Sequence, residues 1–120
     1  MGRLTTHVLD TSRGLPAVGM ALSLYRIDGE RGRRLATSRT DDDGRCAAPL
    51  LDGDAFTADE YEIRFAVGDY LARTGQRNAD ENDPAFLDTV VIRFGVASPD
   101  EHYHVPLLVS PFAYSTYRGS

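Results

Sequence analysis

The hydrophobic positions of the chain fall into short runs that contain β-branched and aromatic residues and are separated by clusters of Gly, Pro and Asp. Runs of this kind predict β-strands joined by tight turns. Strands are expected over residues 4–9, 20–27, 34–40, 61–67, 89–96 and 103–109. Roughly seven or eight strands in a chain of this size favour an all-β sandwich, a fold in which two sheets pack face to face.

Two of these runs alternate clearly, which is the period expected of a strand. One face of residues 20–27 carries Met20, Leu22, Leu24 and Arg26. One face of residues 61–67 carries Tyr61, Ile63, Phe65 and Val67. Each of these strands is therefore expected to present different side chains on its two faces.

The connections between the strands carry their own signals. Residues 28–29 and 42–44 end in Gly after Asp, which is typical of turns. Residues 69–74 predict a short helix, with Asp69 near its beginning and Gly75 as its stop. Residues 79–84 are polar and predict an exposed loop. No internal repeat or linker divides the chain, so residues 1–120 are expected to form one domain.

Composition excludes several classes of function. The 120 residues carry a formal net charge of −5 with an isoelectric point near 5.0, which argues against nucleic-acid binding. No stretch is long and apolar enough to predict a membrane span or a signal peptide. Cys46 is the only cysteine, so no internal disulfide is expected. A cytoplasmic protein that binds neither nucleic acid nor membrane is the expectation.

The three histidines are the first candidates for chemistry. His102 and His104 are two positions apart, so an extended strand would present both rings on one face. His7 would share a face with Thr5 and Leu9. Each histidine alone is more often structural than catalytic. Together the three could supply zinc ligands, but the sequence reveals no acidic ligand, so we expect neither a metal nor another cofactor.

Arg45 directly follows the acidic turn of residues 41–44, which lacks the alternating ligand spacing of a calcium loop. Its planar guanidinium could bind paired carbonyls or an anion, although an exposed loop charge is the commoner role. Cys46 is expected to be a buried or half-buried structural thiol. No Gly-x-Ser-x-Gly motif is present. The residues alone therefore predict a β-sandwich with a few candidate polar side chains.

Two longer segments indicate a family. Residues 4–11 read LTTHVLDT, and residues 102–111 read HYHVPLLVSP before the terminal YSTYRGS of residues 114–120. These segments resemble the two signatures of transthyretin-like proteins. The terminal Tyr-Arg-Gly-Ser resembles the enzymatic branch, the 5-hydroxyisourate hydrolases, and the TDDDGR of residues 40–45 is similar to the turn that carries this family's functional Arg.

The resemblance implies a sandwich of two four-stranded sheets with one short helix, assembled as a homotetramer, a dimer of dimers. It implies cleavage of the small molecule 5-hydroxyisourate to 2-oxo-4-hydroxy-4-carboxy-5-ureidoimidazoline, in a channel between dimers. By matched motif position, the catalytic roles fall to His7, Arg45 and His104, and the substrate-binding roles to Tyr117, Arg118 and Ser120. His102 receives no primary role by this match, and a surface position suits it.

Two other functions remain open at this point. A transthyretin-type carrier would use the same channel for a ligand without catalysis, but it is expected to lack the paired histidines and the Tyr-Arg-Gly-Ser ending. A sandwich without a site would leave His7, Arg45 and His104 as coincidences. Among these, the resemblance favours the hydrolase. The two histidines would share the proton transfers, and the sequence leaves open which of them activates water.

Overall fold

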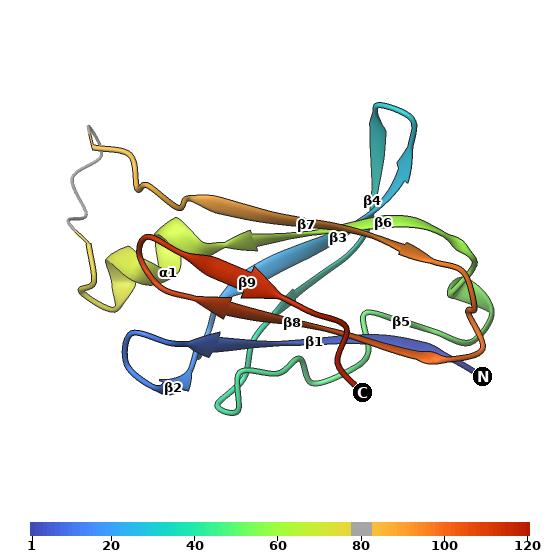
Figure 1. The fold of residues 1–120 in the computed structure, drawn as a ribbon, viewed down its shortest axis with the longest axis horizontal. Helices are drawn as coiled ribbons and strands as arrows, with labels where there is room; N and C mark the ends of the chain where they lie inside the picture. The colour runs from blue at the N-terminus through green and yellow to red at the C-terminus, as the bar shows by residue number, and fades with distance from the viewer. Residues whose placement is uncertain (78–82) are drawn as a thin grey trace.

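Two stacked β-sheets run along the long axis of the computed structural model, which describes residues 1–77 and 83–120 (Figure 1). The first sheet has the order β2-β1-β8-β9, with β5 also paired to β1. Its strands are β1 (Arg3–Asp10), β2 (Leu15–Pro16), β5 (Leu51–Asp52), β8 (His102–Val109) and β9 (Tyr114–Thr116). The second sheet has the order β4-β3-β6-β7. Its strands are β3 (Ala21–Asp28), β4 (Arg31–Arg39), β6 (Asp59–Ala66) and β7 (Thr89–Val96).

The expected all-β sandwich with one short helix is confirmed, and the very short β5 adds a fifth strand to the first sheet. The helix α1 (Val67–Arg73) begins two residues before the predicted start, and a 3-10 turn, η1 (Gly53–Ala55), precedes β6. Gly75 ends α1 as predicted, because it adopts a φ of 73° while its N–H donates to the carbonyl of Ala72. Of the loop predicted over residues 79–84, residues 79–82 lie outside the described residues.

The core lies between the sheets and contains the face predicted for β6. Tyr61, Ile63 and Phe65 are fully buried there. Ile27, predicted on the other side of β3 from Leu22 and Leu24, is also buried but lies outside the core cluster. The alternating faces predicted for these strands are therefore present. Burial is not confined to the face that meets the core, because Ile27 on the other face of β3 is buried as well.

The parallel pairing of β1 with β8 decides which polar side chains meet. Thr5 lies opposite His104 across the pair. Thr6, on the alternate face, is buried and donates its hydroxyl to the Val105 carbonyl at 2.7 Å. Thr5 and His7 on β1 therefore project from the outer face of the sheet, the same face as His104 on β8.

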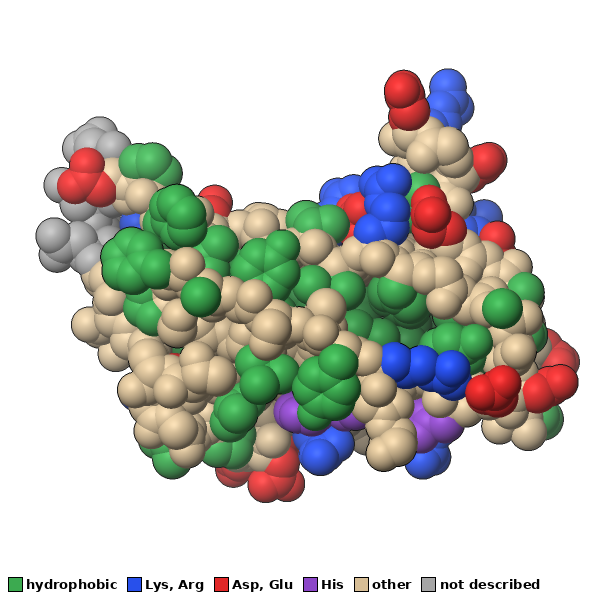
Figure 2. Space-filling view, in the orientation of Figure 1, with side chains coloured by type: hydrophobic (Ala, Val, Ile, Leu, Met, Phe, Trp, Pro, Cys, Tyr) green, Lys and Arg blue, Asp and Glu red, His purple; other side chains and the backbone are tan. Residues whose placement is uncertain are grey.

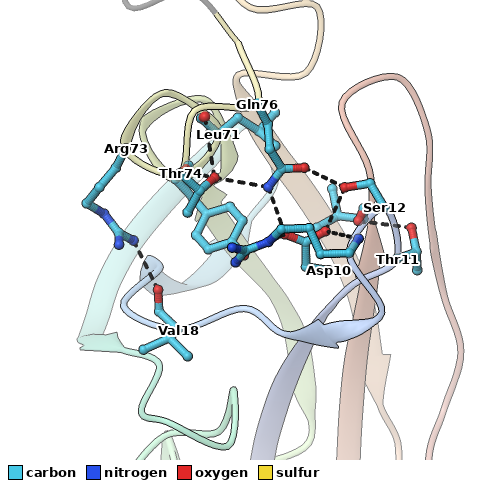
Figure 3. Close-up of polar contacts among 11 residues, drawn as sticks. Asp10, Thr11, Ser12, Val18, Leu71, Arg73, Thr74 and Gln76 are labelled. Carbon is cyan, nitrogen blue, oxygen red and sulfur yellow. Dashed lines mark hydrogen bonds and ion pairs between the residues drawn. The ribbon is translucent and has the colours of Figure 1, made fainter.

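A buried carboxylate ties the end of β1 to α1 (Figure 3). Asp10 is 1% exposed and accepts hydrogen bonds from Tyr70 at 2.6 Å, from Ser12 and Gln76 at 2.8 Å each, and from Arg13 at 3.0 Å. Burial alone would raise the pKa of Asp10, but these hydrogen bonds outweigh it and lower the pKa well below its ordinary value. The ionised form of Asp10 therefore stabilises the fold.

Asp10→Asn is expected to lower the free energy of unfolding at pH 7 by about 2 kcal/mol, because it weakens several hydrogen bonds to a charged acceptor. The native pKa lies below the ordinary value of 3.8, so the carboxylate stabilises fully above about pH 4 and progressively less below it. Urea unfolding across this pH range should thus show the gap between wild type and variant closing in acid. Asp28→Asn, at an exposed aspartate, is the matched control and should leave stability unchanged. A constant gap at all pH values would contradict the role of the Asp10 charge.

Candidate functional site

A cleft of about 370 Å³ opens on the outer face of the first sheet, where β1, β8 and the chain end meet. This volume lies in the usual range for small-molecule sites. Figure 2 shows His side chains reaching the surface beside Arg side chains along the lower edge of the molecule, where this sheet lies. The residues lining the cleft are Arg3, Thr5, Thr6, His7, Arg45, Cys46, His102, His104, Tyr117, Gly119 and Ser120.

His7 and His104 form the centre of the cleft. His7 Nδ1 lies 2.6 Å from His104 Nε2, a distance at which one proton is shared between the two nitrogens. The rings are stacked, with centroids 4.8 Å apart and planes inclined by 22°. The structure thus brings together the two histidines that the sequence resemblance pairs, and this contact leaves Nε2 of His7 as the nitrogen available to a ligand.

Both imidazoles favour the neutral form. The pKa of His104 is lowered to about 4, first by burial and then by the nearby charges of His7, Arg45 and His102. Burial and Arg45 also lower the pKa of His7. At neutral pH the pair therefore presents an uncharged base to the cleft rather than an imidazolium.

The turn of residues 41–44 positions Arg45 against β1. Gly44 adopts a φ of 74°, and a Cβ there would lie 2.5 Å from the Val8 carbonyl oxygen, so the turn can approach β1 only with glycine at this position. The Gly44 carbonyl accepts the Val8 N–H at 2.8 Å, and Arg45 forms a β-bridge with His7. Within residues 1–77 and 83–120, no hydrogen bond or ion pair engages the exposed Arg45 guanidinium. Its donors are therefore available to a ligand.

The chain end closes the other side of the cleft. The Gly119 N–H donates to the His104 carbonyl at 2.7 Å, and a Cβ on Gly119 would lie 2.7 Å from His104 Cδ2. Only a residue without a side chain fits this approach. Tyr117 and Ser120 also line the cleft, and their roles in substrate binding stay a prediction. His104 is 7% exposed although it lies on the outer face of its strand.

Arg118 does not line the cleft of the single chain, and its role in substrate binding stays a prediction. Its guanidinium carbon lies 3.9 Å from the centroid of the Tyr103 ring, and its NH2 forms an ion pair with Glu101 at 3.1 Å. The alternation of the extended tail turns Arg118 away from the side on which Tyr117 and Gly119 lie. In this chain Arg118 fastens the tail to β8.

Six residues line the cleft without having been predicted as site residues, namely Arg3, Thr5, Thr6, Cys46, His102 and Gly119. Thr5 contacts two histidines, Arg3 lies beside them at the beginning of β1, and His102 borders the cleft while remaining exposed. The spacing of His102 and His104 signalled their common face, but nothing in the sequence placed β1 beside β8. Cys46 is half-buried, as expected, and burial raises the pKa of its thiol, which disfavours the thiolate.

Among the described residues, no group of three or more His, Cys, Asp or Glu side chains is arranged to hold a metal ion. The described residues also contain no helix that is long and apolar enough to cross a membrane.

Residues 4–119 match the HIUase/Transthyretin family. Over 120 residues the chain is 57% identical to a 5-hydroxyisourate hydrolase of Ralstonia nicotianae, with 100% of both chains covered.

Solved structures give the same likeness. The structure of Klebsiella pneumoniae 5-hydroxyisourate hydrolase is 34% identical, with a TM-score of 0.79 and 100% of both chains covered. Sea bream transthyretin in complex with thyroxine is 28% identical, with a TM-score of 0.82, covering 98% of this chain and 94% of that one. A crystal structure of (S)-allantoin synthase is 47% identical, with a TM-score of 0.89. It covers 99% of this chain, which spans 44% of that protein.

Proposed function

Because the chain belongs to the HIUase/Transthyretin family, we propose that its cleft hydrolyses 5-hydroxyisourate to 2-oxo-4-hydroxy-4-carboxy-5-ureidoimidazoline. The observation that carries this proposal is the neutral, hydrogen-bonded pair of His7 and His104 beside the available guanidinium of Arg45. Opening a cyclic amide with water needs a base for the water, a donor for the developing oxyanion and a group that holds the ring. The cleft supplies each of these.

The reaction assigns a role to each group. Nε2 of His7 accepts a proton as water attacks the ring carbonyl carbon, and the guanidinium of Arg45 stabilises the oxyanion that forms there. The C–N bond of the ring then breaks, the carbon becomes a carboxylate, and a proton passes to the departing nitrogen. His104 supports His7 through their shared proton, while Tyr117 and Ser120 border the space for the ring.

A carrier function is the second candidate, since a transthyretin of the same fold is solved with thyroxine. The polarity of the cleft argues against it. Two histidines and an arginine converge on a space closed by the tail, whereas a carrier gains little from aligned bases and donors. The hydrolase accounts for these groups, and the carrier does not.

The assembly belongs to the same proposal. We propose that residues 1–120 act as one domain within a homotetramer, a dimer of dimers, and that the cleft faces the channel between dimers. The likeness to transthyretin supports this arrangement, as do exposed apolar side chains on and beside the first sheet, namely Leu15, Val18, Phe112, Tyr114 and Tyr117. A cytoplasmic location stays a prediction from the sequence.

A direct assay tests the proposed function. Urate and urate oxidase generate 5-hydroxyisourate in solution, and the ultraviolet absorbance of this intermediate decays slowly by itself. The protein should accelerate this decay in proportion to its concentration. If purified, folded protein leaves the decay unchanged, the hydrolase proposal is wrong and the carrier becomes the better candidate.

Arg45→Lys should lower kcat/KM roughly 10–100-fold, the equivalent of losing one hydrogen bond to a charged group of about 1.5–3 kcal/mol. Lysine keeps the charge but loses the planar fork that can contact the ring at two points. The same assay measures the change, and Arg31→Lys, on the exposed end of β4, is the matched control. Wild-type efficiency in Arg45→Lys would mean that charge alone matters at this position.

A further inference from the structure

A continuous chain of hydrogen bonds leads from the centre of the cleft to its exposed edge. His7 Nδ1 lies 2.6 Å from His104 Nε2, and His104 Nδ1 lies 2.7 Å from the Thr5 hydroxyl oxygen. The same oxygen lies 2.7 Å from His102 Nε2. Three imidazoles are thus linked, His7 to His104 directly and His104 to His102 through the Thr5 hydroxyl. The proposed hydrolysis uses only the first two of them, which leaves Thr5 and His102 without a role.

Counting protons limits how this chain can be arranged. A hydroxyl carries one proton, so when Thr5 donates to one histidine, the other histidine must donate to Thr5. A single proton likewise occupies the contact between His7 and His104. The tautomers of the three rings are therefore coupled along the chain, and two neutral arrangements satisfy every contact.

The two arrangements differ at both ends of the chain. In the first, Thr5 donates to His102 and His104 donates to Thr5, so His7 donates from Nδ1 and its Nε2 is bare. In the second, every proton has shifted by one contact, so Nε2 of His7 carries a proton and His102 now donates to Thr5. His7 is therefore a base in one arrangement and an acid in the other.

We propose that Thr5 and His102 extend the His7–His104 pair into a proton relay, which moves the positive charge of the reaction from the buried centre of the cleft to His102 at its edge. This inference rests on the proposed hydrolysis. Thr5 and His102 are positioning residues, because they act on the reaction through the His7–His104 pair.

The steps balance without any other reactant. Water gives a proton to His7 Nε2, and the Nδ1 proton of His7 passes to His104 Nε2. The Nδ1 proton of His104 passes to Thr5, whose own proton passes to His102 Nε2. His102 is then an imidazolium, and the reverse sequence delivers the proton from His7 Nε2 to the departing ring nitrogen.

Burial and charge explain why the relay would be useful. His104 is 7% exposed and lies near Arg45 and His7, and its pKa of about 4 makes it a poor holder of positive charge. His102 is exposed, so water can solvate its charged form. Burial, Arg3 and Arg118 lower the pKa of His102 as well, while Glu101 pairs with Arg118. The proton is therefore held only transiently and returns.

The kinetic test replaces Thr5. Thr5→Val keeps the shape of the side chain and removes the hydroxyl, whereas Thr5→Ser keeps the hydroxyl. Thr5→Val should lower kcat about tenfold with KM unchanged, less than the ~10²–10⁴-fold cost of losing a general base. Thr5→Ser should restore most of the rate. Thr37→Val, at an exposed position on β4, controls for the substitution itself. Equal kcat values for Thr5→Val and wild type would overturn the relay.

A spectroscopic test is independent of turnover. The chain has three histidines, so ¹⁵N-labelled histidine gives a small set of ring resonances that report tautomer and protonation. In wild type, the resonances of His7 and His104 should shift as His102 titrates, and Thr5→Val or His102→Gln should abolish this coupling. Independent titration of the three rings in wild type would refute the relay. Absence of 5-hydroxyisourate hydrolysis with the coupling intact would instead refute the proposed function.

Discussion

Replacing His104 by Asn is expected to lower kcat/KM for 5-hydroxyisourate by about 10²–10⁴-fold, the usual range for losing a general acid or base. Asparagine can still form a hydrogen bond with Thr5 or His7, but it cannot exchange a proton between them. The His7–His104 contact of 2.6 Å would lose its shared proton. His7 would then face the water without the partner that orients its ring and fixes its tautomer.

The pH profile gives this prediction a second readout. The pKa of His104 is lowered to about 4, and that of His7 is also lowered, so both rings are uncharged at neutral pH. Wild-type activity should therefore persist into mild acid and fall as the pH drops through these low pKa values. In His104→Asn burial and Arg45 still lower the pKa of His7, so the acid limb should stay at low pH while the rate falls at every pH. Light scattering should find the assembly unchanged. A near-wild-type rate in this variant would remove His104 from the proton transfers.

The strands and the sandwich followed from alternation and turn residues, because side chains on the two faces of a strand meet different surroundings. The pattern of residues did not predict the two-residue strands β2 and β5, because a strand this short has no period to detect. The helix α1 begins two residues before its predicted start, since Val67 continues the apolar pattern of β6 into the helix. Such boundaries depend on packing rather than on local pattern.

The motifs predict which residues form the site, but they do not predict how these residues are arranged in space. His7 and Thr5 lie nearly one hundred positions from His104 in the chain, and only the parallel register of β1 and β8 makes them neighbours. For this reason the contact of Thr5 with two histidines carried no signal in the sequence. The position of Arg118 in the single chain also differs from what its motif suggests. Its motif position suggested the cleft, whereas alternation along the tail sends it to Glu101.

Deleting residues 117–120 is expected to lower hydrolysis by about 100-fold or more, as much as losing a catalytic group. The tail covers His104 through the Gly119 hydrogen bond and supplies two lining residues, Tyr117 and Ser120. Without it, His104 would be more open to water, and the burial that keeps its pKa near 4 would be lost. The decay of 5-hydroxyisourate absorbance measures the loss, and light scattering separates damage to the site from loss of assembly.

A finer variant tests the same contact without removing any residue. In Gly119→Ala the new Cβ would meet His104 Cδ2 at 2.7 Å, closer than real Cβ contacts, so either the tail or the imidazole must shift. A shift of the imidazole would lengthen its hydrogen bonds to His7 and Thr5, and kcat should fall while the fold stays intact. Gly95→Ala, at an exposed position on β7 where a Cβ would meet nothing within 4 Å, controls for replacing a glycine. An N-terminal tag before the exposed Met1 should leave activity unchanged. Full activity in both the truncated protein and Gly119→Ala would mean that the tail lies beside the cleft without taking part in the reaction.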